Sequence, residues 1–205
     1  MKEYHKIETL FNRDKTTFSV IEGEWRLPEF EYLKDNQWEF TEKVDGTNIR
    51  VMWNGQALLW GGKSDNAQIS SFLLTKLQEL FPSTKFAGVF TDEMCLYGEG
   101  YGAKIQKGGG NYIPNGVGFI LFDIKIGEWW LKRDDVTDIA LKLDIKVVPT
   151  VGQGSLIEAI TMVKNGFNSQ WGNFPAEGIV VRPTTELQTR SGHRIIGKIK
   201  TKDFK

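Results

Sequence analysis

Isolated charged residues stand in several short stretches whose composition suits phosphate chemistry. Lys43 precedes Asp-Gly in "EKVDGTNIRV", Glu99 lies between glycines in "LYGEGYG", and Glu177 begins the apolar stretch "EGIVVRP". Lys198 and Lys200 in "GKIK" fall on one face of a strand, where their like charges repel unless an anion lies between them. Such a set would suit a nucleoside triphosphate, with a lysine as nucleophile and a carboxylate for a divalent cation. Neighbouring cations and a bound metal favour the neutral, nucleophilic amine.

The first of these lysines also has a simpler interpretation, as a solvated residue of a β-hairpin. Residues 37–43 and 48–53 alternate apolar and polar side chains and are rich in aromatic and β-branched residues, which is typical of half-buried strands. Asp45-Gly46 between them is a strong turn signal. The choice between a hairpin lysine and a nucleophile therefore depends on the rest of the chain.

Composition limits the class of protein. The chain has 205 residues, 40% of them apolar, and its 26 basic residues balance 26 acidic ones. A net charge of zero argues against an overall basic coat but not against a basic groove on one face. The single cysteine, Cys95, cannot form an internal disulfide, which fits a reducing cytosol. No apolar run has the length of a signal-peptide core or a membrane span, so we expect a cytoplasmic protein without membrane contact.

The hydrophobic patterns predict strands interrupted irregularly by helices. Strand patterns cover residues 37–43, 48–53, 56–60, 94–99, 117–126, 145–149, 178–182 and 194–200. Helix patterns cover "ISSFLLTKLQELFP", "RDDVTDIALKL" and "SLIEAITMVKNG", the first with a stripe of Ile69, Phe72, Leu73, Leu77 and Leu80 and the last with a capping box at Ser155 and Glu158. Strands predominate, which favours an α+β class with mostly antiparallel sheets and flanking helices. No linker or repeat interrupts the chain, so residues 1–205 are expected to form a single domain.

In order and spacing, the charged stretches resemble the motifs of the covalent nucleotidyltransferases, which include polynucleotide ligases and messenger-RNA capping enzymes. "KVDGTN" resembles their nucleophile motif, "LYGEG" the ribose-binding motif, "FILFDI" the base-stacking strand, "EGIVVR" the metal-site motif and "KIK" the last motif of the catalytic domain. The resemblance spans about residues 37–202. It implies an ATP-grasp-like nucleotidyltransferase domain.

Two features indicate the branch of that family. Asn48 stands where DNA ligases and capping enzymes usually carry arginine, and "DGTN" resembles the ATP-dependent RNA ligases. The chain ends five residues after Lys200, which leaves no room for the C-terminal oligonucleotide-binding (OB) fold of the other branches. The sequence therefore resembles the catalytic domain of an RNA ligase standing alone.

The resemblance implies roles residue by residue. Lys43 would attack the α-phosphorus of ATP, release pyrophosphate and form a lysyl-AMP phosphoramidate, while Lys198 and Lys200 contact the α-phosphate and the leaving group. Glu177 and Asp45 would hold Mg²⁺ or Mn²⁺. The implied cofactor-binding set is Glu42, Asn48, Arg50, Lys63, Glu99, Phe122, Lys198 and Lys200.

Within that set, Glu99 would bind ribose hydroxyls and Phe122 would stack on adenine, with Phe119 as the alternative because the register of the strand is open. Lys63 in "GGKSDN" stands where these ligases tend to have arginine. Lysine keeps the charge but loses the bidentate fork, and Arg50 is the candidate to substitute in part.

In the implied reaction, AMP passes to an RNA 5′-phosphate, and an RNA 3′-hydroxyl then attacks the activated end and expels AMP. This activity suggests RNA repair, with a monomer as the expected form and partner proteins left open. Two other functions stay open: a DNA ligase or GTP-dependent capping-type domain, and a nucleotide-dependent RNA-binding protein that does not seal. The intact nucleophile and acidic residues argue against the last.

Overall fold

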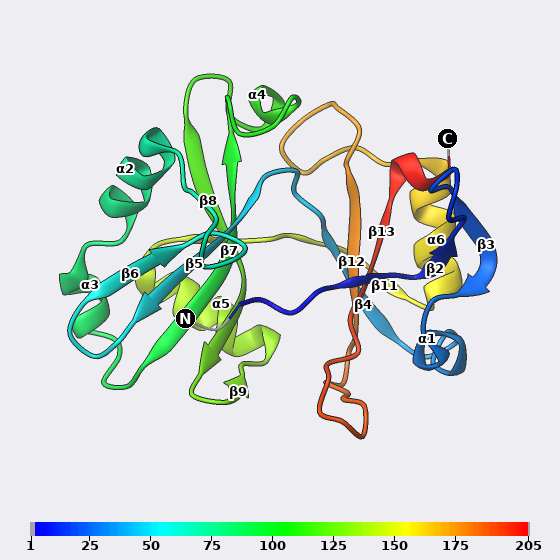
Figure 1. Ribbon diagram of the computed structural model, residues 1–205, viewed down its shortest axis with the longest axis horizontal. Coiled ribbons are helices and arrows are strands. Elements are labelled where there is room, and N and C mark those ends of the chain that lie inside the picture. The colour runs from blue at the N-terminus through cyan, green and yellow to red at the C-terminus, as the bar shows by residue number, and fades with distance from the viewer. Residues whose placement is uncertain (1–2, 205) are drawn as a thin grey trace. The chain divides into compact units, whose positions relative to one another are not determined.

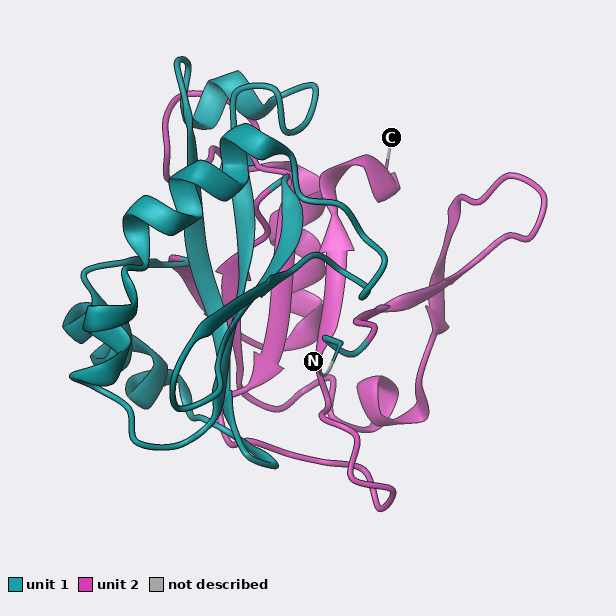
Figure 2. Ribbon diagram, turned by 60° about the vertical axis from the view of Figure 1, so that its left-hand side comes forward, with its two compact units in different colours: residues 1–5, 45–148 teal, residues 6–44, 149–205 magenta. Residues whose placement is uncertain are grey.

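The computed structural model describes residues 3–204 and divides the chain into two compact units (Figure 2). Unit 1 consists of Met1–His5 and Asp45–Val148, and unit 2 of Lys6–Val44 and Pro149–Lys205. Each unit therefore combines segments that are distant in the sequence. The boundary between Val44 and Asp45 falls inside the stretch "EKVDGTNIRV", so its lysine and its aspartate belong to different units.

Unit 1 is built on one sheet with the strand order β10-β8-β7-β5-β6, to which β9 adds by pairing with β8. Its strands are β5 (Thr47–Trp53), β6 (Leu58–Gly61), β7 (Met94–Gly102), β8 (Val117–Ile126), β9 (Trp129–Trp130) and β10 (Lys146–Val147). Its helices are α2 (Ser71–Leu80), α3 (Ser83–Ala87), α4 (Gly109–Tyr112) and α5 (Arg133–Leu143). All pairs are antiparallel except β8 with β10.

The core of unit 1 lies between this sheet and its helices. Leu73 and Leu77 of α2 join Val136 and Ala140 of α5 in one cluster with Ile49 of β5. Because successive residues of a strand point to opposite faces, the residues that alternate with this core point to the other face of the sheet. Figure 1 shows α2 and α3 alongside the strands.

Unit 2 contains a second sheet with the order β1-β13-β12-β4-β11 and a separate ribbon of β2 and β3. Its strands are β1 (Glu8–Thr9), β2 (Phe11–Arg13), β3 (Val20–Trp25), β4 (Trp38–Glu42), β11 (Thr150–Gly154), β12 (Gly178–Pro183) and β13 (Gly197–Lys200). Its helices are α1 (Pro28–Tyr32), α6 (Leu156–Asn165) and the 3₁₀ helix η1 (Thr201–Phe204). The apolar face of α6 packs on Trp38, Phe40 and Ile179.

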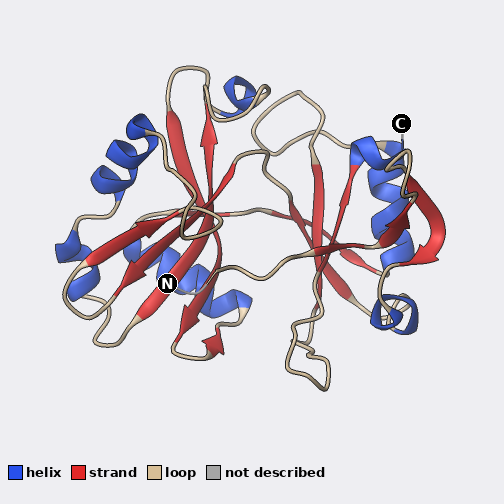
Figure 3. Cartoon of the chain, in the orientation of Figure 1, coloured by secondary structure: helices blue, strands red, loops and turns tan. Residues whose placement is uncertain are grey.

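The α+β class with mostly antiparallel sheets is confirmed (Figure 3). The expected strand at 117–126 is β8, and "RDDVTDIALKL" is α5 to the residue. Helix α6 begins at the predicted capping box, in which the Glu158 backbone N–H donates to the Ser155 hydroxyl at 3.2 Å. The Ser155 backbone N–H donates in return to the Glu158 carboxylate at 2.7 Å.

The hairpin interpretation of "EKVDGTNIRV" is wrong. Strand β4 pairs with β11 and β12, whereas β5 pairs with β6 and β7, so the two strands beside Asp45-Gly46 belong to different sheets. A turn signal fixes the local change of direction but not the partner of each strand, which is decided by burial against residues far along the chain. Lys43 is accordingly not a solvated hairpin residue.

Smaller departures occur at element ends. Phe72 of α2 is 42% exposed, because it points away from the stripe of Leu73 and Leu77 that meets the core. The expected strand at 194–200 begins only at Gly197, and the one at 145–149 shortens to a two-residue strand. Among residues 3–204, no helix has both the length and the apolar character that crossing a membrane requires.

Candidate active site

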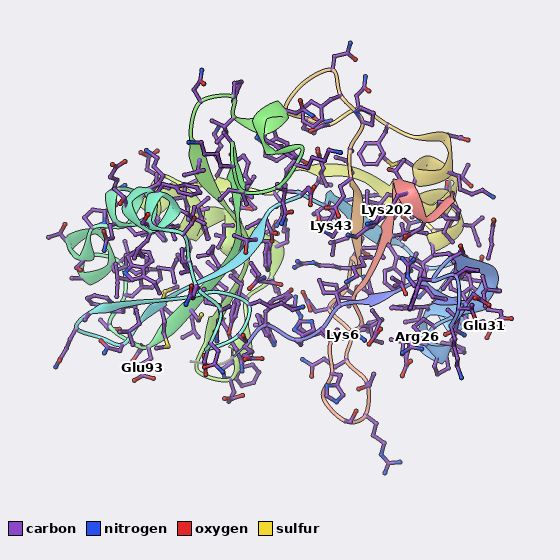
Figure 4. All side chains as sticks on the ribbon, turned by 45° about the horizontal axis from the view of Figure 1, so that its top comes forward. Lys6, Arg26, Glu31, Lys43, Glu93 and Lys202 are labelled. Atoms are coloured by element: carbon purple, nitrogen blue, oxygen red, sulfur yellow. The ribbon has the colours of Figure 1, made fainter. Side chains whose placement is uncertain are left out.

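Lys43 lies immediately after β4, in unit 2 (Figure 4). Its backbone N–H donates to the Gly178 carbonyl at 2.9 Å, so the main chain continues to pair with β12 one residue beyond the strand. Its side-chain Nζ lies 2.7 Å from Oε2 of Glu177, although the two residues are 134 positions apart in the sequence. The predicted nucleophile is therefore placed against the predicted metal ligand.

Glu177 bridges two lysines. Its Oε2 accepts from Lys43, and its Oε1 lies 2.6 Å from Nζ of Lys200. The exposed fractions of the three side chains are 22% for Lys43, 14% for Glu177 and 23% for Lys200, so the cluster is mostly shielded but open to a ligand. The Glu177 carboxylate therefore supplies an anion to Lys43 and to one lysine of "GKIK", Lys200.

Gly178 makes this arrangement possible. It is opposite Lys200 in the antiparallel pair of β12 and β13. A Cβ at this position would lie 2.2 Å from the Ile199 carbonyl oxygen, and its φ of +154° is one that side chains rarely adopt. Glycine therefore allows the two strands to approach closely at the point where Glu177 meets Lys200.

Lys198 lies on the same face of β13 as Lys200, because the two residues are two positions apart in a strand. It is opposite Val180 of β12 and partly buried. The Thr201 backbone N–H donates to the Glu177 carbonyl at 2.9 Å, which fixes the end of β13 against the residue before β12. Both lysines of "GKIK" thus share one face of the unit 2 sheet.

Glu42 does not join this cluster, contrary to its predicted place in the cofactor-binding set. It alternates with Lys43 and falls on the side of Trp38 and Phe40, where it is 1% exposed. Its Oε2 accepts from the Gln170 backbone N–H at 2.8 Å, and its Oε1 is buried without a hydrogen-bond partner. Burial raises the pKa of this carboxyl above its usual 4.5.

The raised pKa gives a testable pH dependence. In the folded protein Glu42 takes up its proton at a higher pH than in the unfolded chain, so folding loses stability as pH rises from about 4.5 through the folded pKa. A glutamine at this position would keep the acceptor for Gln170 without a charge. We expect Glu42→Gln to raise the free energy of unfolding by about 1 kcal/mol at neutral pH and to have no such advantage near pH 4. Urea unfolding at several pH values measures this, and an equal effect at all pH values would contradict it.

Part of the predicted nucleotide-binding set lies on one face of the unit 1 sheet. Asn48 and Glu99 are directly opposite each other on β5 and β7, and Ile120 of β8 is opposite Glu99 in turn. This is the face that does not meet α2 and α5, because Ile49, which follows Asn48 on β5, points to the other face and joins the core. Oδ1 of Asn48 is buried without a hydrogen-bond partner, an acceptor suited to a ligand hydroxyl or amine.

The two phenylalanines of "FILFDI" differ in surroundings. Phe119 is 4% exposed and its ring lies 5.2 Å from that of Phe81 in the core, so it is a core residue. Phe122 is partly exposed and meets Tyr4 edge-to-face at 5.0 Å. It sits at the irregularity where the register of β7 and β8 shifts. Of the two, only Phe122 is partly exposed.

Asp45 and Gly46 are held by hydrogen bonds to the glycine-rich segment after β7. The Asp45 backbone N–H donates to the Tyr112 hydroxyl at 3.2 Å, and the Gln106 amide donates to the Gly46 carbonyl at 2.9 Å. A Cβ on Gly46 would lie 2.3 Å from the Gly100 carbonyl oxygen, so only glycine allows this approach to β7. Glu99 is the residue beside that contact, since its Cγ lies 2.8 Å from the same Cβ position.

Arg50 has a structural role instead of the predicted partial substitution for Lys63. It is fully buried, and its Nε donates to the Gly62 carbonyl at 2.7 Å while Nη2 lies 2.9 Å from Asp65. These contacts hold the turn that carries Lys63, which is exposed. A guanidinium already engaged in this way positions the turn and is not free to turn toward phosphate.

Some residues of these surroundings were not predicted from the sequence. Tyr4 donates to the buried Asp123 carboxylate at 2.5 Å, and Ser169 and Gln170 surround Glu42. No local sequence pattern predicts these contacts, because the partners are more than a hundred residues apart in the sequence.

In the described part of the chain, no cluster of three or more His, Cys, Asp or Glu side chains is arranged to hold a metal ion.

Comparison with known proteins identifies the family of this chain. The chain matches the RNA ligase family over residues 36–200 and belongs to that family. A search of curated proteins found no significant match.

Solved structures show the same fold. A Naegleria gruberi RNA ligase mutant with ATP and Mn aligns with a TM-score of 0.73 at 17% identity, covering 98% of this chain and 56% of that one. The Naegleria gruberi RNA ligase with PPi aligns at 0.70 and 19% identity, covering 100% and 63%. Another mutant with ATP and Mn aligns at 0.69 and 19%, covering 86% and 52%. The chain thus spans between about half and two thirds of the length of these ligases.

Proposed function

We propose that this protein is an ATP-dependent RNA ligase that joins RNA 5′-phosphate and 3′-hydroxyl ends through a lysyl-AMP intermediate. The observation that carries the proposal is the Glu177 carboxylate bridging Lys43 and Lys200. A structural ion pair needs one lysine, whereas phosphoryl transfer needs a nucleophile, an oxygen ligand and a cation in one place. Membership of the RNA ligase family supports the same assignment.

Adenosine nucleotide is the proposed substrate of the first step. The similar Naegleria gruberi ligases were solved with ATP and Mn, with AMP and Mn and with PPi, which supports ATP as the donor and a divalent cation as the cofactor. In unit 1, Asn48 and Glu99 would bind ribose hydroxyls and Phe122 would stack on adenine. The shared sheet face of Asn48 and Glu99 supports this use.

The donor set fits a Mg²⁺ or Mn²⁺ ion that is bound mainly by water and substrate phosphates. Mg²⁺ in nucleotide enzymes keeps several waters and binds one or two carboxylates together with substrate phosphates. Glu177 offers one hard oxygen donor beside the nucleophile, and Asp45 is the proposed second carboxylate. The lack of a three-residue cluster among residues 3–204 agrees with an ion held mainly by water and phosphate. Such an ion would supply charge stabilisation at the phosphates.

The residues of unit 2 account for the first chemical step. The Lys43 amine, once it has lost a proton, forms a bond to the α-phosphorus of ATP as the bond to pyrophosphate breaks. Lys198 and Lys200 stabilise the charge that develops on the phosphate oxygens and the leaving group. While Glu177 pairs with the Lys43 ammonium, the nitrogen has no free lone pair, so the ligand-bound state requires this carboxylate to exchange partners.

Two further transfers complete the reaction. An RNA 5′-phosphate oxygen attacks the phosphorus of lysyl-AMP, restoring the lysine and forming a diphosphate-linked RNA end. An RNA 3′-hydroxyl then attacks that 5′-phosphorus, forming the phosphodiester and releasing AMP. We propose that both units together make up one nucleotidyltransferase domain for this sequence, acting in RNA repair.

The test is covalent labelling of the purified chain. Incubation with α-labelled ATP and Mg²⁺ should leave acid-labile label on the denatured protein, and added 5′-phosphorylated RNA should remove it as adenylylated and then joined RNA. Label from GTP instead would indicate a capping-type enzyme. Joining of DNA ends but not RNA ends would indicate a DNA ligase. Tight ATP and RNA binding without label would indicate a protein that does not seal.

A further inference from the structure

Phe18 occupies an unusual position at the tip of the β2–β3 ribbon. Its side chain is 69% exposed, and its φ of 59° lies in the left-handed region. Bulky side chains are disfavoured there, and glycine or asparagine is the usual choice. Because the ring makes little contact with the protein, packing does not explain why a phenylalanine is used.

The turn that presents Phe18 is well organised. Oδ1 of Asp14 accepts from the backbone N–H groups of Thr16 and Thr17 at 2.9 and 2.7 Å. The Phe18 N–H donates to the Asp14 carbonyl at 3.0 Å, and the Asp14 N–H donates to the Ser19 carbonyl at 2.9 Å. The hydrogen bonds from Thr17 and Thr16 lower the pKa of Asp14, which keeps the carboxylate ionised and in place. The ring is thus held out on a preformed turn.

The turn is tied to the end of the strand that carries the active-site lysines. Arg13 donates through Nη1 to the Phe18 carbonyl at 2.9 Å and through Nη2 to Asp203 at 2.5 Å. Asp203 in turn accepts from the Lys200 backbone N–H at 3.0 Å. Figure 1 shows η1, which contains Asp203, beside the β2–β3 ribbon. All these residues belong to unit 2.

Two exposed lysines stand near this turn. Lys15 is exposed on the turn, and Lys202, which Figure 4 labels, is exposed on η1. Lys202 directly precedes Asp203, the partner of Arg13. Asp14 is engaged within the turn, and Asp203, whose side chain is 1% exposed, pairs with Arg13. Farther along β3, Glu22 pairs with Lys164, and Glu24 is exposed. An exposed aromatic ring beside exposed cations is complementary to a nucleobase and its phosphates, and less so to an apolar protein surface.

We propose that Phe18, Lys15 and Lys202 form a docking point for single-stranded RNA, with a nucleobase stacked on the Phe18 ring and phosphates contacted by the two lysines. The inference rests on the proposed RNA ligase function and names where its substrate strand is held. The hydrogen bonds through Arg13 and Asp203 place this point next to the end of the strand that carries Lys198 and Lys200.

The test measures binding of a fluorescent 5′-phosphorylated single-stranded oligoribonucleotide to the full chain. Phe18→Ala should weaken binding roughly 10-fold, within the range of one lost base stack, and Phe18→Trp should restore it. Lys15→Gln should lower the slope of log affinity against log salt by about 0.7, the loss of one phosphate contact. Tyr32, which is 86% exposed in the same unit, provides the matched control, and Tyr32→Ala should leave binding unchanged.

Phe18→Gly separates recognition from folding. Glycine relieves the left-handed φ, so the thermal midpoint should hold or rise while RNA affinity falls as in Phe18→Ala. Loss of stability and binding together in Phe18→Gly would overturn the inference. So would unchanged RNA binding in both variants, which would point to a protein contact for the ring.

Failure of the inference is distinguishable from failure of the proposed function. Labelling by ATP does not involve RNA, so all Phe18 variants should keep the wild-type labelling rate. A wild-type protein that labels and seals, with Phe18 variants that bind RNA equally well, would overturn only the docking point. A wild-type protein without label or sealing would overturn the proposed function itself.

Discussion

Lys43→Arg is expected to abolish covalent labelling by ATP and, with it, ATP-dependent joining of RNA. Arginine keeps a positive charge near Glu177, but its guanidinium stays protonated and cannot attack phosphorus. Removing the nucleophile of a covalent mechanism should lower the rate by on the order of 10⁴-fold or more. The measurement is the rate of label incorporation under single-turnover conditions.

Two controls make this result specific. Lys34, which pairs with Asp35 in the same unit, is a lysine of similar setting, and Lys34→Arg should label at the wild-type rate. RNA supplied with an adenylylated 5′ end bypasses the lysine, so Lys43→Arg should still join it. If Lys43→Arg kept the label, or lost joining of adenylylated RNA as severely as joining with ATP, the assignment of Lys43 as nucleophile would be wrong.

Glu177→Gln should produce the second large effect. The amide keeps the shape of the side chain but removes the negative charge from between Lys43 and Lys200, where it lies 2.7 and 2.6 Å from the two amines. It also replaces the proposed carboxylate ligand of the metal by a neutral amide, which binds Mg²⁺ more weakly. We expect labelling to fall on the order of 10²-fold or more, and the Mg²⁺ concentration for half-maximal rate to rise.

The same substitution leaves two partly shielded cations facing each other, which should lower the free energy of unfolding by about 1 to 3 kcal/mol. The metal dependence distinguishes this from a chemical role, because a purely structural loss would not change the Mg²⁺ requirement of the folded fraction. Glu31, exposed in α1, is the control, and Glu31→Gln should change neither quantity. An unaltered Mg²⁺ requirement in Glu177→Gln would contradict the metal-ligand role.

Local sequence patterns predicted the helices and strands that are specified by interactions between residues close in the sequence. Helix α5 and strand β8 have the expected bounds, and α6 begins at its capping box, because amphipathic spacing and capping act over a few residues. Strand partners were not predictable in the same way. Strand β4 pairs with β11 and β12, which follow more than a hundred residues later, and β1 pairs with β13 near the other end of the chain.

The candidate site shows the same division. Motif order indicated that Lys43, Glu177 and Lys200 belong to one site, and the structure brings these three together. Motif order could not indicate that Glu42 points to the side of the sheet opposite to Lys43. That orientation follows from strand alternation in a register set by β12. Nor could it show that Arg50 is committed to the turn at Gly62, because that contact depends on the pairing of β5 with β6.

The most direct test of the account is to locate the adenylyl group on the wild-type chain. Protein freed of any bound AMP would be incubated with ATP and Mg²⁺, digested under conditions that preserve phosphoramidates, and its peptides compared by mass spectrometry. The account predicts the mass increment of one AMP on the peptide that contains Lys43 and on no other. An adduct at Lys198 or Lys200, or no adduct in protein that binds ATP, would contradict it.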